Sequence, residues 1–349
     1  MKLSILIPVY NAERFIERCL NSLIIQDLDK NEYEIIIIND GSTDNSLEIV
    51  ENYSKEHANV VFYSHENQGV VATRNKLLKH AKGTYIYFLD ADDYLAHNSF
   101  GVILEFALKN DIDIIGFKTL VTSCDNLVSL DKKNVDLETQ KIVSGSEYLS
   151  KNNNIRVEIW WYFVKKEFLE ENNILFIPKG YDDDLGFTLT LFLKAKKVVH
   201  YPIEIHRYYQ SSESTMRGNN KISKRRISEY FMALILDFTK IINDLENQSF
   251  KHQKTIKSNF TLRRNTLTFF TIIKLIKAQF NLSIVKEKIN QLEMIKAYPI
   301  GPLNREENNV LKFRILIFII NHKQMLYSVV SVCNFLRKLF SLKSLKLNK

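Results

Sequence analysis

Short apolar runs alternate with stretches of helical periodicity along the first part of the chain. Apolar runs typical of buried strands occupy residues 3–9, 33–38, 59–63 and 84–89. Between them, apolar side chains at helical spacing predict helices over residues 12–25, 42–53 and 70–81. Because strand and helix alternate, the pattern predicts an α/β fold with a mainly parallel, Rossmann-like sheet flanked by helices.

Polar segments follow three of these strands. The segment PVYN (8–11) ends the first strand, NDGSTD (39–44) the second and DADD (90–93) the fourth. In a parallel sheet, ligands bind outside the carboxyl ends of the strands. The three segments therefore predict one binding site at that edge of the sheet.

The last of these segments contains three carboxylates. Asp90, Asp92 and Asp93 come directly after the apolar run YIYFL. Carboxylates this close repel one another, and the repulsion is costly beside a low-dielectric core. A divalent cation, Mn²⁺ or Mg²⁺, would offset the charge, since hard cations prefer carboxylate oxygens and often bind substrate phosphates as well. The alternative is a solvated acidic loop that caps the next helix.

The pattern changes in the second half of the chain. We predict a helix over residues 95–108, a strand over 113–117, a polar loop over 120–141 and a second helix over 185–193. From about residue 216 onward the pattern is helical to the end of the chain. This division predicts an N-terminal domain over residues 1–216, in two halves that meet near residue 117, and a helical C-terminal region over residues 217–349.

Basic residues gather at the end of a chain whose formal net charge is +8. Residues 310–349 contain eight Lys and Arg and no acidic residue. The run ILIFII (315–320) is too short to span a bilayer. We expect an interfacial helix attracted to anionic lipid, or a helix packed on the N-terminal domain or on a second subunit, which leaves the oligomeric state open. No recognised nucleic-acid-binding fold accompanies the charge, so we expect no nucleic-acid partner.

Several classes of protein are excluded by motifs that the sequence lacks. It has no GxxxxGK[ST], no GxGxxG after a strand and no GxSxG, which argues against P-loop kinases, dinucleotide dehydrogenases and α/β-hydrolases. Cys19, Cys124 and Cys333 are far apart and lack CxxC spacing, so neither a disulfide framework nor a zinc site is expected. The chain enters LSILIPVY without an apolar leader. We therefore expect a cytoplasmic protein, peripheral at the inner face of the plasma membrane if its C-terminal helices bind lipid.

Five segments in order give a more specific pattern. They are PVYN, NDGSTD, NQGVVATRN (67–75), DADD and YDDDLGF (181–187). Over roughly residues 1–215 this pattern resembles the family 2 glycosyltransferases of the GT-A fold. The resemblance implies an inverting, metal-dependent enzyme that moves a sugar from a nucleotide-sugar donor to a hydroxyl group. Residues 1–117 would form its donor half and residues 118–216 its acceptor half.

The resemblance also implies roles for residues at the strand ends. Pro8 and Tyr10 would pack beside the nucleotide base, and Asp40 would accept hydrogen bonds from it. The alternative for Asp40 is the N-cap of the next helix. Ser42 or Thr43 would serve as that cap equally well, so we expect Asp40 to be free to bind.

Arg74 and the acidic segment would hold the diphosphate. Arg74, on the helix after Gly69, would reach nucleotide or diphosphate oxygens, and its alternative is an ordinary surface arginine. Asp90 would contact the ribose or the metal. Asp92 would ligate the metal, which offsets charge on the departing nucleoside diphosphate. Asp93 would ligate the metal too, or cap the following helix.

An inverting transfer also needs a base that takes the proton of the acceptor hydroxyl. Family members place a Glu-Asp pair before an apolar helix, and this pair becomes Asp183-Asp184 here. Asp184 is therefore the expected base, although Asp182 beside the altered Asp183 leaves a shift by one position open. The alternative is an acidic helix N-terminus favoured by the helix dipole.

Aromatic and basic residues downstream complete the expected site. Trp160 and Trp161 would stack on the acceptor sugar, or else belong to the core. His206 and Arg207 lie where relatives close over the diphosphate. His206 would be a further metal ligand or, as a lone histidine near a strand more often is, structural.

We therefore predict a glycosyltransferase of the hexosyl or N-acetylhexosaminyl class. Its donor would be UDP-linked, and its acceptor would be a growing, lipid-linked glycan of a bacterial surface polysaccharide. One alternative is a non-catalytic scaffold that binds sugar nucleotide or lipid, against which the intact DADD segment and Asp184 argue. Another is a sugar nucleotidyltransferase, which would carry a Gly-rich phosphate loop where this chain has PVYNAERF.

Overall fold

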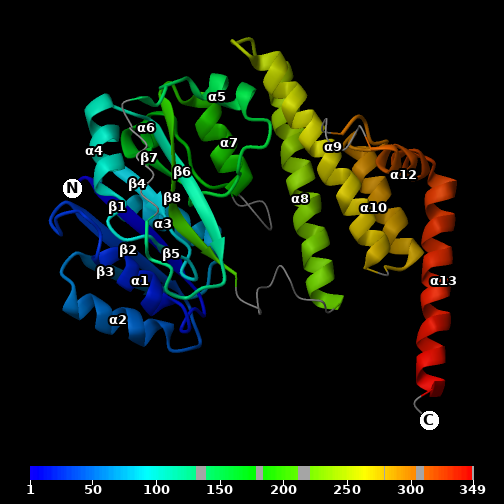
Figure 1. Ribbon diagram of the computed structural model, residues 1–349, viewed down its shortest axis with the longest axis horizontal. Helices are drawn as coiled ribbons and strands as arrows, with labels where there is room; N and C mark the ends of the chain where they lie inside the picture. Colours follow the sequence, from blue (N-terminus) through cyan, green and yellow to red (C-terminus); the bar gives the residue numbers. More distant parts are fainter. Residues whose placement is uncertain (131–138, 178–183, 211–220, 279, 304–309, 348–349) are drawn as a thin grey trace. The chain divides into compact units, whose positions relative to one another are not determined.

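Two compact units make up the protein. The computed structural model describes residues 1–130, 139–177, 184–210, 221–278, 280–303 and 310–347. The N-terminal unit contains the described residues up to 210, and the C-terminal unit contains those from 221 on (Figure 1).

The N-terminal unit is built on one eight-stranded sheet in the order β3-β2-β1-β4-β7-β6-β8-β5. The strands are β1 (Leu3–Val9), β2 (Tyr33–Asp40), β3 (Val60–His65), β4 (Tyr85–Phe88), β5 (Tyr94–Leu95), β6 (Ile114–Thr122), β7 (Tyr162–Lys165) and β8 (Val198–Tyr209). The first four strands are parallel, as is the β6–β8 pair, whereas β7 and β5 run antiparallel to their neighbours. The prediction of a mainly parallel sheet is confirmed.

Helices cover both faces of this sheet (Figure 1). They are α1 (Ile16–Ile24), α2 (Ser46–Glu56), α3 (Val70–His80), α4 (Gly101–Asn110), α5 (Gly145–Lys151), α6 (Lys166–Glu171) and α7 (Asp184–Lys194). Successive side chains of a strand point to opposite faces. Leu3, Ile5 and Ile7 of β1 therefore pack in the core shared with α1, α2 and α4. On the other face, Phe88 packs edge-on against Phe187 of α7, with ring centroids 6.1 Å apart.

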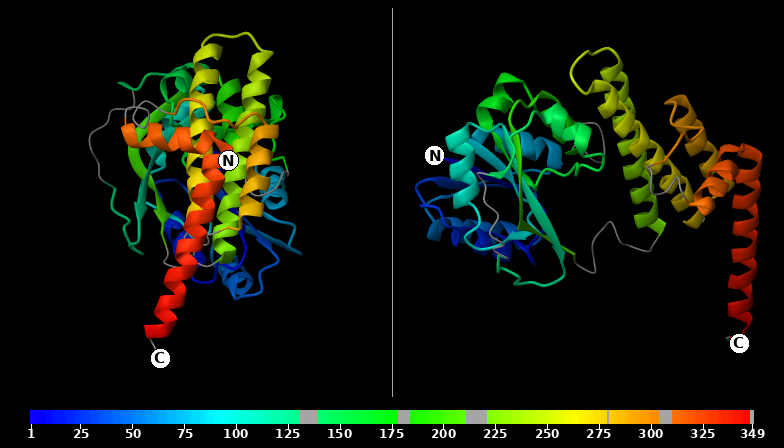
Figure 2. Two further views of the ribbon diagram at one scale, coloured as in Figure 1. Left: turned by 90° about the vertical axis from the view of Figure 1, so that its right-hand side faces the viewer. Right: turned by 45° about the horizontal axis from the view of Figure 1, so that its top comes forward.

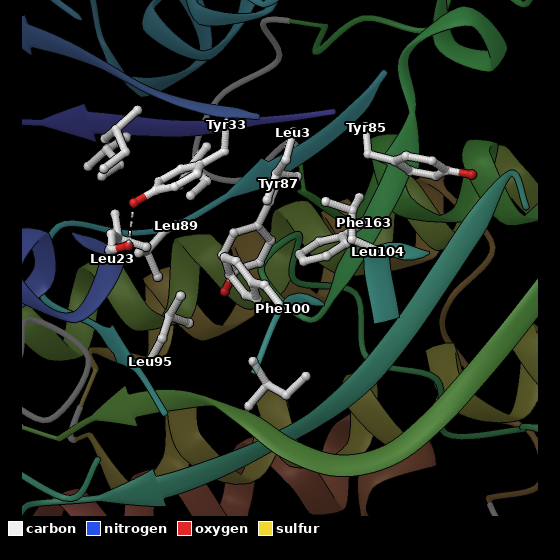
Figure 3. Close-up of a cluster of buried hydrophobic side chains, with 14 of the residues drawn as sticks. Leu3, Leu23, Tyr33, Tyr85, Tyr87, Leu89, Leu95, Phe100, Leu104 and Phe163 are labelled. Carbon is white, nitrogen blue, oxygen red and sulfur yellow. Dashed lines mark hydrogen bonds between the residues drawn. The ribbon is translucent and has the colours of Figure 1, made fainter. Parts of the chain in front are cut away.

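Aromatic side chains fill the centre of the first core. Tyr87, Phe100 and Phe163 contact one another edge to face, with ring centroids 5.0–5.5 Å apart (Figure 3). Tyr33 donates a hydrogen bond of 3.2 Å from its hydroxyl to the carbonyl oxygen of Leu23, which ties β2 to α1. Each buried phenol thus adds a polar link to the apolar contact area of its ring.

The helix predicted at residues 95–108 begins later than expected. Tyr94–Leu95 form β5 against β8, and α4 starts only at Gly101. Asp27, in the loop after α1, accepts hydrogen bonds at Oδ1 from the backbone N–H groups of Phe100 (3.1 Å) and Gly101 (2.9 Å). A side chain far upstream therefore caps this helix, which local sequence does not reveal.

The polar stretch expected to be a loop, 120–141, begins inside a strand. β6 continues to Thr122 because its last residues pair in register with Arg207–Tyr209 of β8. Residues 123–130 have no regular structure, and residues 131–138 lie outside the described part of the chain. Strand pairing with a partner late in the sequence thus overrides the weak local pattern.

All regular secondary structure in the described residues of the C-terminal unit is helical, as predicted (Figure 2). Its helices are α8 (Lys221–Glu246), α9 (Gln253–Lys277), α10 (Leu282–Met294), α12 (Leu311–Asn321) and α13 (Lys323–Leu347). They enclose a second apolar core that includes Phe269, Ile289 and Leu326. Among the described helices none is long and apolar enough to cross a bilayer alone. Only α12 and residues 323–338 together, bent by 101° where they meet, have that length and composition.

Removing the cap of α4 should destabilise the N-terminal unit. We expect Asp27→Ala to lower the free energy of unfolding by about 1–2 kcal/mol, because two N–H groups at the helix start lose their acceptor. Asp27→Asn keeps an acceptor oxygen and should retain most of the stability. Urea unfolding followed by tryptophan fluorescence measures this unit, since the two tryptophans, Trp160 and Trp161, both lie in it. Equal losses for Ala and Asn would contradict the capping role.

Candidate active site

The loops after β1 and β2 are locked together at the carboxyl edge of the sheet. The side-chain oxygen of Asn11 accepts a hydrogen bond of 2.8 Å from the Thr43 backbone N–H, and the Asn11 N–H donates to the Ser42 hydroxyl at 3.0 Å. Gly41 has a φ of +71°, and a Cβ there would lie 2.6 Å from the backbone nitrogen of Asn67. A side chain at this position is excluded, so the turn after β2 lies directly against the loop after β3.

Tyr10 and Asp40 lie at this edge but differ in exposure. Tyr10 is 54% exposed and presents its ring to solvent, whereas Asp40 is only 4% exposed. Asp40 accepts hydrogen bonds from the backbone N–H groups of Gln68 (2.7 Å) and Gly69 (3.0 Å). Both carboxylate oxygens of Asp40 therefore have backbone partners in the loop before α3, and these partners are not those of an N-cap at Ser42. Its carboxylate fixes the point where α3 begins.

The acidic turn after β4 separates its carboxylates. The N–H of Asp93 donates to the carbonyl oxygen of Asp90 at 3.1 Å, and this turn leaves Asp92 exposed and Asp93 fully buried. Arg18 of α1 donates to the Asp92 carbonyl oxygen at 2.6 Å and forms an ion pair of 2.7 Å with Asp125. The backbone of the turn is thus held by a cation that leaves the Asp92 carboxylate available.

The surroundings of this turn disfavour negative charge. Partial burial of its carboxyl group, followed by repulsion from Asp93 and Asp90, raises the pKa of Asp92 to about 7. Burial and the charge of Asp90 likewise raise the pKa of Asp93 well above its usual range. A cation bound at Asp92 would relieve this repulsion.

Arg74 joins the acidic turn to a distant carboxylate. It lies on α3, is 6% exposed, and donates to Asp90 Oδ1 at 3.3 Å and to Asp184 Oδ1. The alternative of an ordinary surface arginine does not fit this burial. The ion pair with Asp184 brings together two segments 110 positions apart in the sequence.

Asp184 is the first residue of α7 and is 8% exposed. Its position at a helix N-terminus agrees with the alternative in which the helix dipole favours an acid, yet its carboxylate also turns toward Arg74 and the acidic turn. Asp183 lies outside the described residues. The structure therefore brings Asp90, Arg74 and Asp184 of the predicted site into direct contact.

His206 connects Asp93 to the core. Its ring is fully buried, with Nε2 2.9 Å from Asp93 Oδ2 and Nδ1 2.9 Å from the Tyr87 hydroxyl. Burial lowers the pKa of His206 to about 3. The pKa directions of His206 and Asp93 both favour the neutral forms, in which the carboxyl group donates to the imidazole. Since both ring nitrogens have protein partners, the geometry fits the structural alternative for His206.

The two tryptophans and Arg207 are also part of the protein interior. Trp160, 5% exposed, stacks on His206 with ring centroids 4.4 Å apart, and Trp161, 3% exposed, stacks on Phe192. This burial fits the core alternative rather than stacking on a sugar. Arg207 donates hydrogen bonds to the backbone carbonyl oxygens of residues 127, 129 and 204, so its guanidinium is engaged by the protein backbone.

Two carboxylates remain that fit a divalent cation. Asp92 is exposed, and Asp90 has one oxygen on Arg74, whereas both oxygens of Asp93 already have partners. In the part of the chain that the structure describes, no group of three or more His, Cys, Asp or Glu could hold a metal ion. Two carboxylate ligands nevertheless suit Mg²⁺ or Mn²⁺, which commonly complete their coordination with water and substrate phosphates.

Comparison with known proteins agrees with this geometry. Residues 4–172 match the family described as Glycosyl transferase family 2. This part of the chain belongs to that family. Glycosyltransferase EpsJ of Bacillus subtilis, itself uncharacterized, is 32% identical over 217 residues, which cover 60% of this chain and 62% of EpsJ. The poly(ribitol-phosphate) beta-glucosyltransferase of Bacillus spizizenii is 38% identical over 208 residues, which cover 57% of this chain and 30% of that enzyme.

The chain also resembles solved structures over most of its length. The crystal structure of S. aureus TarS 1–349 in complex with UDP-GlcNAc matches with a TM-score of 0.67 and 21% identity, over 97% of this chain and 92% of that one. A likeness at this identity shows the GT-A fold, as predicted. The chain spans less than two thirds of the length of the two relatives named above.

Arg74 and Asp184 should be energetically coupled. Arg74→Ala leaves Asp184 and Asp90 facing each other without a cation, whereas Asp184→Asn removes one of the repelling charges. We expect a coupling free energy of about 1–3 kcal/mol in the double-mutant cycle of Arg74→Ala and Asp184→Asn. Urea unfolding followed by tryptophan fluorescence gives the four values. Strictly additive losses would show that the pair contributes no interaction of its own.

Proposed function

We propose that the protein is an inverting glycosyltransferase that moves a sugar from a UDP-linked donor to a hydroxyl group of a growing glycan. The observation that carries this proposal is the contact of Arg74 with both Asp90 and Asp184. It joins an acidic turn suited to a diphosphate and its metal to a carboxylate suited to be a base. The family of residues 4–172 and the UDP-GlcNAc complex of the TarS fold support the same donor class.

The donor half supplies binding and charge. The exposed ring of Tyr10, with Pro8 beside it in β1, offers an apolar surface for the base, and Asp40 holds the neighbouring loop in place. Asp92, with Asp90, would hold Mn²⁺ or Mg²⁺, which neutralises charge on the departing diphosphate when bound. The guanidinium of Arg74 offers several N–H donors and suits phosphate oxygens as well as carboxylates.

Asp184 is the group we assign as general base. A base of this kind accepts the proton of the acceptor hydroxyl while that oxygen attacks the sugar carbon opposite the leaving group. In the present structure its Oδ1 is occupied by Arg74. A diphosphate that attracts the same guanidinium would weaken this ion pair and make the carboxylate more basic. Binding of the donor would in this way prepare the base for the acceptor.

The acceptor we propose is a bacterial cell-surface polymer or its lipid-linked precursor. Support comes from the name of the Bacillus spizizenii relative, which acts on poly(ribitol-phosphate). We further propose that the chain works in the cytoplasm at the inner face of the membrane, where such precursors are exposed. A non-catalytic scaffold and a nucleotidyltransferase remain the alternatives that an assay has to separate.

Binding and turnover should respond differently to two substitutions. With Mn²⁺ present, UDP or a UDP-sugar should raise the melting temperature of the purified protein, and Asp92→Ala should abolish the metal-dependent part of that shift. Asp184→Asn should keep the shift but lower sugar transfer about 100-fold or more, because it removes the base and leaves Asp90, Asp92 and Tyr10 in place to bind the metal and the nucleotide. Asp29→Asn is the matched control, since Asp29 lies before β2 at the opposite edge of the sheet.

The outcomes separate the three hypotheses. Nucleotide-dependent stabilisation without turnover on any donor would support the scaffold. Formation of a sugar nucleotide from a sugar phosphate and a nucleoside triphosphate would support the nucleotidyltransferase. Unchanged transfer by Asp184→Asn would show that another residue is the base.

A further inference from the structure

The last two helices of the C-terminal unit expose apolar side chains in regular rows. On α12, Leu311, Ile315 and Phe318 are 52–67% exposed. Their spacing of four and three residues places them on one face of the helix. Ile320, on the opposite face, is buried in the core of the unit. The helix therefore has one apolar face inside the protein and a second one outside it.

The same arrangement continues on α13. Met325, Val329, Val332 and Leu336 follow one another at helical spacing and are 36–54% exposed, and Phe335 beside them is 64% exposed. Leu326 and Val330 occupy another face of α13 and are buried. A surface helix normally turns polar side chains to water. We call the exposed apolar side chains of α12 and α13 the apolar rows.

Positive charge surrounds the apolar rows. Residues 310–349 contain eight Lys and Arg and no acidic residue. Lys323 and Arg337 also serve the fold, because Lys323 pairs with Glu293 at 2.7 Å and Arg337 donates to the Ile276 carbonyl oxygen at 2.9 Å. Lys312 and Arg314 lie on α12 beside its row and are exposed. The surface thus combines apolar side chains with unbalanced positive charge.

We infer that the apolar rows and their flanking cations dock on an anionic lipid bilayer, with α12 and the first part of α13 lying in the interface. Apolar side chains of an interfacial helix insert between lipid acyl chains while basic residues contact anionic headgroups. A second copy of the chain fits this surface less well, because the charged residues of 310–349 are all basic and two such segments would repel each other. The inference concerns binding to lipid only and is independent of the proposed transfer activity.

Vesicle co-sedimentation of the full chain tests this inference. We expect binding to phosphatidylcholine vesicles that contain 30% phosphatidylglycerol, and at least tenfold weaker binding to pure phosphatidylcholine. Binding should also fall as salt is raised from about 0.1 M to 0.5 M, because the Debye length shortens. Phe318→Glu/Phe335→Glu should weaken binding at least tenfold. Lys312→Gln/Arg314→Gln should reduce the preference for the anionic lipid.

A matched variant controls for the added negative charge. Val102→Glu/Leu175→Glu changes two exposed apolar residues of the N-terminal unit, 57% and 53% exposed, and should alter vesicle binding less than twofold. Equal loss in both double variants would overturn the inference. Equal binding to the two kinds of vesicle would also overturn it. So would resistance of the bound protein to carbonate extraction, which would indicate that α12 and α13 span the bilayer as a pair. A dimer in light scattering that Phe318→Glu/Phe335→Glu dissociates would overturn it as well.

Discussion

The candidate site depends on one buried cation, the guanidinium of Arg74, placed between carboxylates from two distant segments. Without it, the partly exposed Asp90 and the buried Asp184 would face each other with no cation to compensate their charges. Arg74 is held in position by the start of α3, and that start is fixed by the two hydrogen bonds that Asp40 accepts from the loop before it. The geometry of the carboxylates can therefore be traced to the turn after β2.

Buried aromatic rings on the core side of the acidic turn hold it in place. Asp93 is anchored by His206 and by the N–H of Tyr209, and His206 is in turn stacked on Trp160. Asp92, one residue earlier, faces solvent. Adjacent residues of the same type thus have opposite tasks, one rigidifying the turn and the other presenting charge. A rigid support of this kind limits how far the exposed carboxylate can move when a ligand binds.

The sequence predicted the parts of the fold that local periodicity encodes. Strands and helices up to β4 could be predicted because each buries an apolar face whose spacing is visible along the chain. β5 and the start of α4 could not, since they depend on β8 and on Asp27, which lie far away in sequence. Within the site, the motif positions located the acidic turn and Arg74. Sequence alone left Trp160 and His206 between two roles, because the same side chain serves as ligand contact or as core, and only its three-dimensional neighbours decide.

Arg207 has a consequence for how this protein can change over generations. Its guanidinium donates hydrogen bonds to backbone carbonyl oxygens of the segment after β6, and every amino acid has such an oxygen. Substitutions at Leu127 and Ser129 would leave these acceptors in place. The segment can therefore vary its side chains while its path is kept by an arginine on another strand. The side chains of this segment are therefore open to mutation, while its backbone contacts with Arg207 maintain its conformation.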